Sequence, residues 1–108
     1  MTVIGHNSAA LRDEMLVEAL RSSSIRLAVE QWVKATGVQY VAIAADLGVS
    51  RQYLRDLLAQ DRDLKDEHIL ALPDGLRQVV AEIRARQYEG SAANLRTLAG
   101  VPKKWVQS

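Results

Sequence analysis

Polar side chains that can donate several hydrogen bonds gather in one short segment, where Arg51 and Gln52 follow Ser50 and Arg55 stands one helical turn later. Residues for catalysis or metal binding are not gathered in this way. The chain has no cysteine, and His6 and His68 are 62 positions apart. It also has no glycine-rich loop of the kind that cradles phosphates. We therefore expect hydrogen-bonded recognition, with no enzymatic activity, no metal and no cofactor.

The spacing around this segment predicts two short helices joined by a tight turn, within YVAIAADLGVSRQYLRDLL at residues 40–58. Ala44 is small enough for a second helix to cross closely over the first. Gly48 comes four residues later, where a turn needs a positive φ that a Cβ disfavours. Val49 fills the turn, and Ser50 can cap the next helix with its hydroxyl. The apolar residues expected to face the core are Ile43, Leu47, Leu54 and Leu57.

With these residues at these positions, the segment resembles the helix-turn-helix of the lambda-repressor and Cro type. One predicted helix before it and two after it resemble the five-helix bundle of that family, over about residues 24–88. The resemblance implies that residues 50–60 form a recognition helix whose first turn enters the major groove of DNA.

The resemblance also implies a role for each polar side chain. Arg51 would donate two hydrogen bonds to guanine and Gln52 would pair with adenine, while Arg55 would reach a base or a flanking phosphate. The residues expected to contact phosphates near the helix N-termini are Gln39, Tyr40 and Ser50.

Two features depart from the family pattern. The first position of the motif often carries a phosphate-binding glutamine, but here it is Tyr40, with Gln39 one residue early. Asp56 lies on the face that would approach DNA, and more acidic residues follow it (Asp61, Asp63, Asp66 and Glu67), where they would repel phosphates. That stretch could instead face a protein. Tyr53 could follow the DNA backbone or pack on the bundle, and we expect packing.

Apolar residues recur at helical spacing along nearly the whole chain, which predicts an all-α fold. We expect a small helical bundle over 23–88 that contains the helix-turn-helix, an N-terminal arm and amphipathic helix over 1–22, and a basic C-terminal helix and tail over 89–108. Thr2 to Ile4 could form a short strand, because the alternation expected of a half-buried strand is possible there. The remaining predicted helices cover residues 8–21, 24–36, 66–71, 75–88 and 93–99.

Three residues predict where these helices begin or end. Gly37 is placed to end the helix over 24–36, Pro73 to stop the helix over 66–71, and Asp74 to cap the helix over 75–88. The apolar residues at helical spacing are Leu11, Met15 or Leu16, Ala19 and Leu20 in the first helix, and those expected to face inward from the helix over 75–88 are Leu76, Val79, Val80 and Ile83.

Composition and charge set broader limits. The chain has 108 residues, 48% hydrophobic and 25% charged, with a net charge of +1. No apolar run is long enough for a transmembrane span, and no secretion signal is apparent, so we expect a cytoplasmic, nucleoid-associated protein. Residues 56–76 carry a charge of −4 and residues 77–108 a charge of +4. The basic end could bind phosphates or an acidic protein surface, or could be a solvated helical face.

The C-terminal segment LRTLAGVPKKWV partly repeats the motif, since Leu95, Gly100, Val101 and Val106 match Ile43, Gly48, Val49 and Leu54 in spacing. Arg96 takes the place of Ala44 and is too bulky for a close crossing. The segment is therefore either a second, partial helix-turn-helix or a terminal helix with a basic tail anchored by Trp105. In both cases Lys103 and Lys104 are candidates for contact with phosphates or with a partner.

These observations predict a sequence-specific transcriptional regulator that binds double-stranded DNA. A single module of this size reads little DNA, so we expect a homodimer on two half-sites. We expect the helix over residues 8–21 to form the dimer contact, with the basic C-terminal segment as the second candidate. The first helix could instead pack on its own bundle. Two alternatives remain: a phage-type late-gene regulator or antiterminator that binds RNA polymerase, and an antitoxin with a helix-turn-helix fold.

Overall fold

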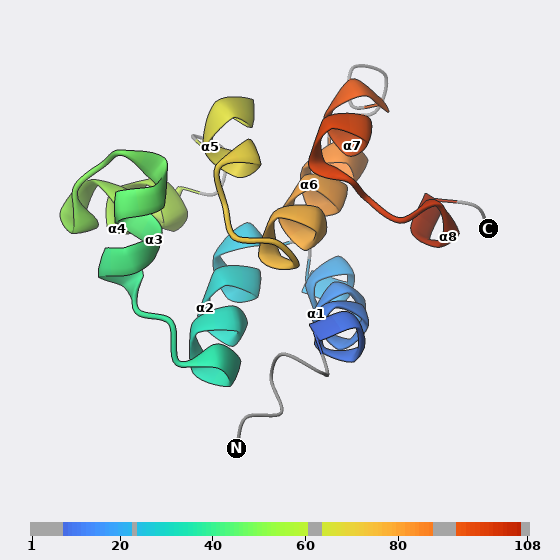
Figure 1. The fold of residues 1–108 in the computed structure, drawn as a ribbon, viewed down its shortest axis with the longest axis horizontal. Helices are drawn as coiled ribbons and strands as arrows, with labels where there is room; N and C mark the ends of the chain where they lie inside the picture. The colour runs from blue at the N-terminus through green and yellow to red at the C-terminus, as the bar shows by residue number, and fades with distance from the viewer. Residues whose placement is uncertain (1–7, 23, 61–63, 88–92, 107–108) are drawn as a thin grey trace.

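The computed structural model describes residues 8–22, 24–60, 64–87 and 93–106, and all regular secondary structure within them is helical (Figure 1). This confirms the predicted all-α fold. The helices are α1 (Ser8–Ser22), α2 (Ile25–Thr36), α3 (Tyr40–Leu47), α4 (Arg51–Ala59), α5 (Asp66–Leu70), α6 (Leu76–Gln87), α7 (Ala93–Ala99) and α8 (Lys103–Val106). The possible strand at Thr2 to Ile4 lies outside the described residues.

Local signals explain where several helices begin and end. The Ser24 hydroxyl accepts a hydrogen bond from the backbone nitrogen of Leu27 at 3.1 Å, which caps the start of α2. Gly37 ends the same helix with a φ of 78°, as expected from its position. Helix α5 stops before Pro73, also as predicted. Asp74, expected to cap the next helix, forms an ion pair with Arg77 at 2.7 Å, and α6 begins at Leu76.

Helix α6 is the central element, and α1, α2, α5 and α7 pack around it (Figure 1). The four residues predicted to face inward, Leu76, Val79, Val80 and Ile83, are at most 1% exposed. A helix surrounded in this way is buried on nearly every side, so it places the other helices relative to one another.

One continuous apolar core joins all three segments into which the sequence was divided. Met15 and Leu16 of α1 are buried in it, so this face of α1 packs on its own chain. Trp105 of α8 is 8% exposed and contributes from the other end of the sequence. The other side chains expected on this face of α1 (Leu11, Ala19 and Leu20) lie outside the described set.

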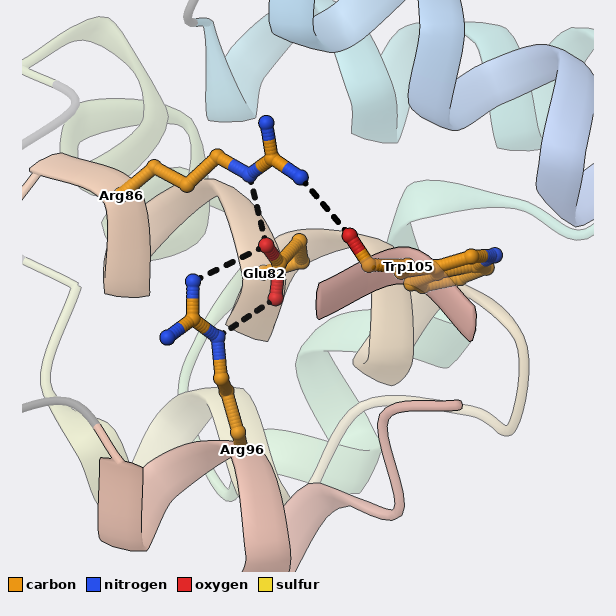
Figure 2. A network of polar contacts seen from close by, with 4 residues as sticks. All are labelled: Glu82, Arg86, Arg96 and Trp105. Carbon is orange, nitrogen blue, oxygen red and sulfur yellow. Dashed lines mark hydrogen bonds and ion pairs between the residues drawn. The ribbon is translucent and has the colours of Figure 1, made fainter. Parts of the chain in front are cut away.

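A buried carboxylate ties α6, α7 and α8 together (Figure 2). Glu82 is fully buried and accepts hydrogen bonds from Arg86 at 2.6 Å and from Arg96 at 2.7 and 3.0 Å. Arg86 also donates to the backbone carbonyl of Trp105 at 3.0 Å. Burial alone would raise the pKa of Glu82, but the hydrogen bonds and charges of Arg96 and Arg86 outweigh it and hold that pKa below 4.5.

Candidate nucleic-acid interface

The turn between α3 and α4 has the backbone geometry that the sequence predicts. Gly48 has a φ of 73°. The backbone nitrogen of Val49 donates to the carbonyl of Ala44 at 3.0 Å, which closes the end of α3. The Ser50 hydroxyl accepts a hydrogen bond from the backbone nitrogen of Tyr53 at 3.0 Å and so caps α4. The turn therefore holds the first residues of α4 in a defined orientation.

Apolar contacts hold α4 by one side only. Ala44 is 2% exposed, and α3 packs against α4. Ile43 of α3 and Leu54, Leu57 and Leu58 of α4 are buried in the shared core, and Leu47 and Val49 pack against it. The predicted inner face is therefore confirmed, and it leaves the opposite side of α4 open.

The open side of α4 carries Arg51, Gln52, Arg55 and Asp56, all exposed. Neither arginine forms an ion pair with another described residue. The Gln52 amide nitrogen donates to the Asp56 carboxylate at 3.1 Å. This hydrogen bond uses one of the two N–H donors of the Gln52 amide. The Gln52 amide oxygen takes no part in it.

Tyr53 corrects the expectation that it packs on the bundle, because it is 48% exposed. The reason lies in the helical spacing. Leu54, Leu57 and Leu58 occupy the buried side of α4, and Tyr53 lies about 90° of helical rotation from the middle of that side, at its edge. Its ring therefore adds to the open surface of the helix.

Two hollows beside α4 bring together four of the predicted contact residues. Gln39, Tyr40, Val41 and Arg51 line one of about 510 Å³, together with Val33. A second hollow, of about 460 Å³, lies between α2 and α4; we call it the arginine groove, and it is lined by Arg26, Glu30, Tyr40, Arg51, Arg55, Leu58 and Ala59. Tyr40 and Arg51 belong to both hollows, so Tyr40 stands beside the exposed side of α4.

The environment of Tyr40 keeps its hydroxyl protonated. Burial and the nearby carboxylate of Glu30 raise the pKa of the Tyr40 phenol above 10.0, against the opposing charges of Arg26 and Arg55. The phenol is consequently a hydrogen-bond donor at neutral pH.

Sequence reasoning missed Arg26 and Glu30, which lie on α2 outside the motif. One signal was available for Arg26. It stands in the first turn of a helix, where the helix dipole disfavours a positive charge, and α2 has no acidic residue in that turn.

The acidic residues after α4 are only partly described. Asp66 and Glu67 are exposed in the first turn of α5, where the helix dipole favours negative charge. Asp66 and Glu67 therefore stabilise the start of α5, which explains two of the acidic residues that follow α4. Asp61 and Asp63 lie outside the described residues.

The predicted contacts Lys103 and Lys104 are not brought together with the others. They belong to α8, which lies at the opposite side of the molecule from α3 and α4 (Figure 1). Lys104 forms an ion pair with Asp13 of α1 at 3.2 Å, and the indole nitrogen of Trp105 donates to the same carboxylate at 3.1 Å. Lys103 and Lys104 therefore do not belong to the surface formed by α3 and α4.

The C-terminal segment repeats the turn of the motif but not its helix packing. Gly100 has a φ of 76°, and the nitrogen of Val101 donates to the carbonyl of Arg96 at 3.0 Å, as Val49 does to Ala44. Arg96 turns to Glu82, and α8 docks on α1, where the Arg12 guanidinium lies 5.8 Å from the Trp105 ring centre. The tail is therefore anchored by Trp105.

Comparisons with models of protein families, with curated proteins and with solved structures gave no match. The helices of the described residues include none that is both long and apolar enough to cross a membrane. Those residues also contain no group of three or more histidine, cysteine or acidic side chains arranged to hold a metal ion.

Proposed function

We propose that this protein is a sequence-specific DNA-binding transcriptional regulator whose helix α4 enters the major groove. One observation carries the proposal: a helix anchored by its apolar side presents Arg51, Gln52 and Arg55 together on its exposed side. The fold itself does not need these three side chains, since none of them belongs to the core.

The chemistry of these residues suits base recognition. The guanidinium of Arg51 can donate two parallel hydrogen bonds to the O6 and N7 atoms of guanine. The Gln52 amide can accept from and donate to adenine, and Asp56 would orient it through their hydrogen bond at 3.1 Å. Their place at the start of α4 suits a helix that enters the groove by its N-terminal end.

Two copies on neighbouring half-sites would give the specificity that one module lacks. The Met15 and Leu16 face of α1 is occupied by its own core, which argues against this face as the dimer contact. A dimer would therefore use another surface, and its arrangement on DNA would depend on half-site spacing.

The decisive experiment is selection of duplexes from a random library with the purified full chain, followed by fluorescence anisotropy on the selected sequence. We expect one motif to be enriched, with affinity that falls steeply as salt rises. The double substitution R51A/Q52A should reduce the preference for that motif by roughly 30-fold or more, because each paired contact contributes about 1–3 kcal/mol.

Lys34→Ala is the matched control. It removes one positive charge from the side of α2 that lines a separate hollow with α1. No enriched motif, or an equal loss in the control, would contradict the proposal. Co-purification of RNA polymerase, without duplex selection, would support the alternative of a polymerase-bound regulator.

A further inference from the structure

The arginine groove lies beside α4 but draws half of its charged side chains from outside the helix-turn-helix. Arg51 and Arg55 come from α4, and Arg26 and Glu30 come from α2. Three positive charges therefore stand against one negative charge in a hollow of about 460 Å³. This balance favours an anionic ligand.

Two of these arginines stand in the first turn of a helix. Arg26 lies in the first turn of α2, and Arg51 is the first residue of α4. The helix dipole disfavours cations at both positions, and neither first turn contains an acidic residue that would compensate. The helix dipole therefore stabilises neither charge, whereas an anion bound in the groove would offset this effect.

The remaining lining residues fit a tetrahedral oxyanion. Tyr40 contributes a hydroxyl that stays protonated at neutral pH, and Leu58 and Ala59 add an apolar wall. Guanidinium groups donate paired hydrogen bonds to phosphate oxygens in the same way as to carboxylates. The groove shares Arg51 and Arg55 with the exposed side of α4, so it opens beside the proposed DNA surface.

We propose that the arginine groove binds one phosphate of the DNA backbone, through Arg26 and Arg55 with the Tyr40 hydroxyl, while Arg51 remains available for a base. This inference rests on the proposed function. It assigns Arg55 to the backbone rather than to a base and extends the interface to α2. Glu30 opposes the phosphate and lowers the affinity.

The test is the salt dependence of binding, measured by anisotropy on the selected duplex and on a scrambled duplex of equal length. Each phosphate contact contributes about 0.9 to the slope of log affinity against log salt. Arg26→Ala should lower the slope by about 0.9, and the affinity for both duplexes roughly eightfold at about 0.1 M salt. The preference between the two duplexes should not change.

Two further variants sharpen the result. Glu30→Gln should raise the affinity for both duplexes by about three- to tenfold, since it removes a charge that repels the phosphate. Lys34→Ala removes the same charge as Arg26→Ala from the same helix, on the side facing α1, and should leave the slope unchanged. Arg26 is exposed, so Arg26→Ala should remain folded, and a thermal melt checks this.

The outcomes separate this inference from the function on which it rests. If the wild type selects a motif but Arg26→Ala keeps the wild-type slope, the phosphate site is refuted and the proposed function stands. The phosphate site would also be refuted if Arg26→Ala changed which base is preferred at one position of the selected duplex. If no motif is selected but Arg26→Ala loses affinity equally for every duplex, the result supports the phosphate site and contradicts sequence-specific regulation. A wild-type chain that binds no duplex refutes both.

Discussion

Replacement of Glu82 by glutamine is the most informative test of how the helices are held together. The two carboxylate oxygens of Glu82 are fully buried and accept three hydrogen bonds from Arg86 and Arg96, at 2.6 to 3.0 Å (Figure 2). Glutamine has nearly the same shape. It lacks the negative charge, however, and turns an NH2 donor toward arginines that are donors themselves.

The expected loss follows from the burial of the three partners. Removing one member of a buried ion pair destabilises a protein by about 3–5 kcal/mol. The Arg96 and Arg86 side chains are 24% and 41% exposed, so water can partly solvate them once the carboxylate is gone. We therefore expect about 3 kcal/mol, the lower end of that range. For a domain of about this size, the melting temperature would fall by roughly 12–24 °C.

Urea unfolding followed by far-ultraviolet circular dichroism measures the loss directly. Asp74→Asn is the matched control, because it also neutralises one carboxylate that pairs with an arginine. The Asp74 side chain is 85% exposed, however, so its loss should be at most about 1 kcal/mol. Equal shifts of the unfolding midpoint in the two variants would refute the argument that burial gives the Glu82 network its strength.

Two further predictions concern the same fold. The folded-state pKa of Glu82 lies below its ordinary value of 4.5, so the stabilisation is present above that value and is lost as pH falls through the lowered pKa. The difference in unfolding free energy between the wild type and Glu82→Gln should therefore be constant down to about pH 5 and shrink below it; a difference that grows in acid would contradict this sign. Gly48→Ala should destabilise by about 1–2 kcal/mol through its φ alone, because its Cβ would meet no atom within 4 Å. Gly75→Ala should cost more, because its Cβ would also lie 3.1 Å from the Trp32 ring. Urea titrations of the two glycine variants check this order, and equal losses would contradict it.

The C-terminal segment illustrates how one local pattern leads to two different packings. Gly48 and Gly100 both adopt positive φ, and the residue after each closes the preceding helix by the same kind of hydrogen bond. The difference arises at the crossing position. Ala44 lets α4 pack closely on α3, whereas Arg96 extends to Glu82, and α8 packs on α1.

The sequence by itself determined the features that depend on near neighbours. Ser24 and Ser50 cap helices through backbone groups three residues away, and Gly37 and Gly48 end helices through their own φ. The period of apolar residues identified the buried side of α6 and of α4. These signals are local, because each depends on the geometry of one or two helical turns.

Only the tertiary structure decided which charged residues are available to a ligand. The C-terminal arginines and lysines look alike in the sequence, yet Arg96 pairs with a carboxylate 14 positions away and Lys104 with one 91 positions away. Arg26 likewise lines the arginine groove only because α2 packs beside α4. A charge has no preferred partner spacing along the chain, so its role is set by which helices the buried core brings together.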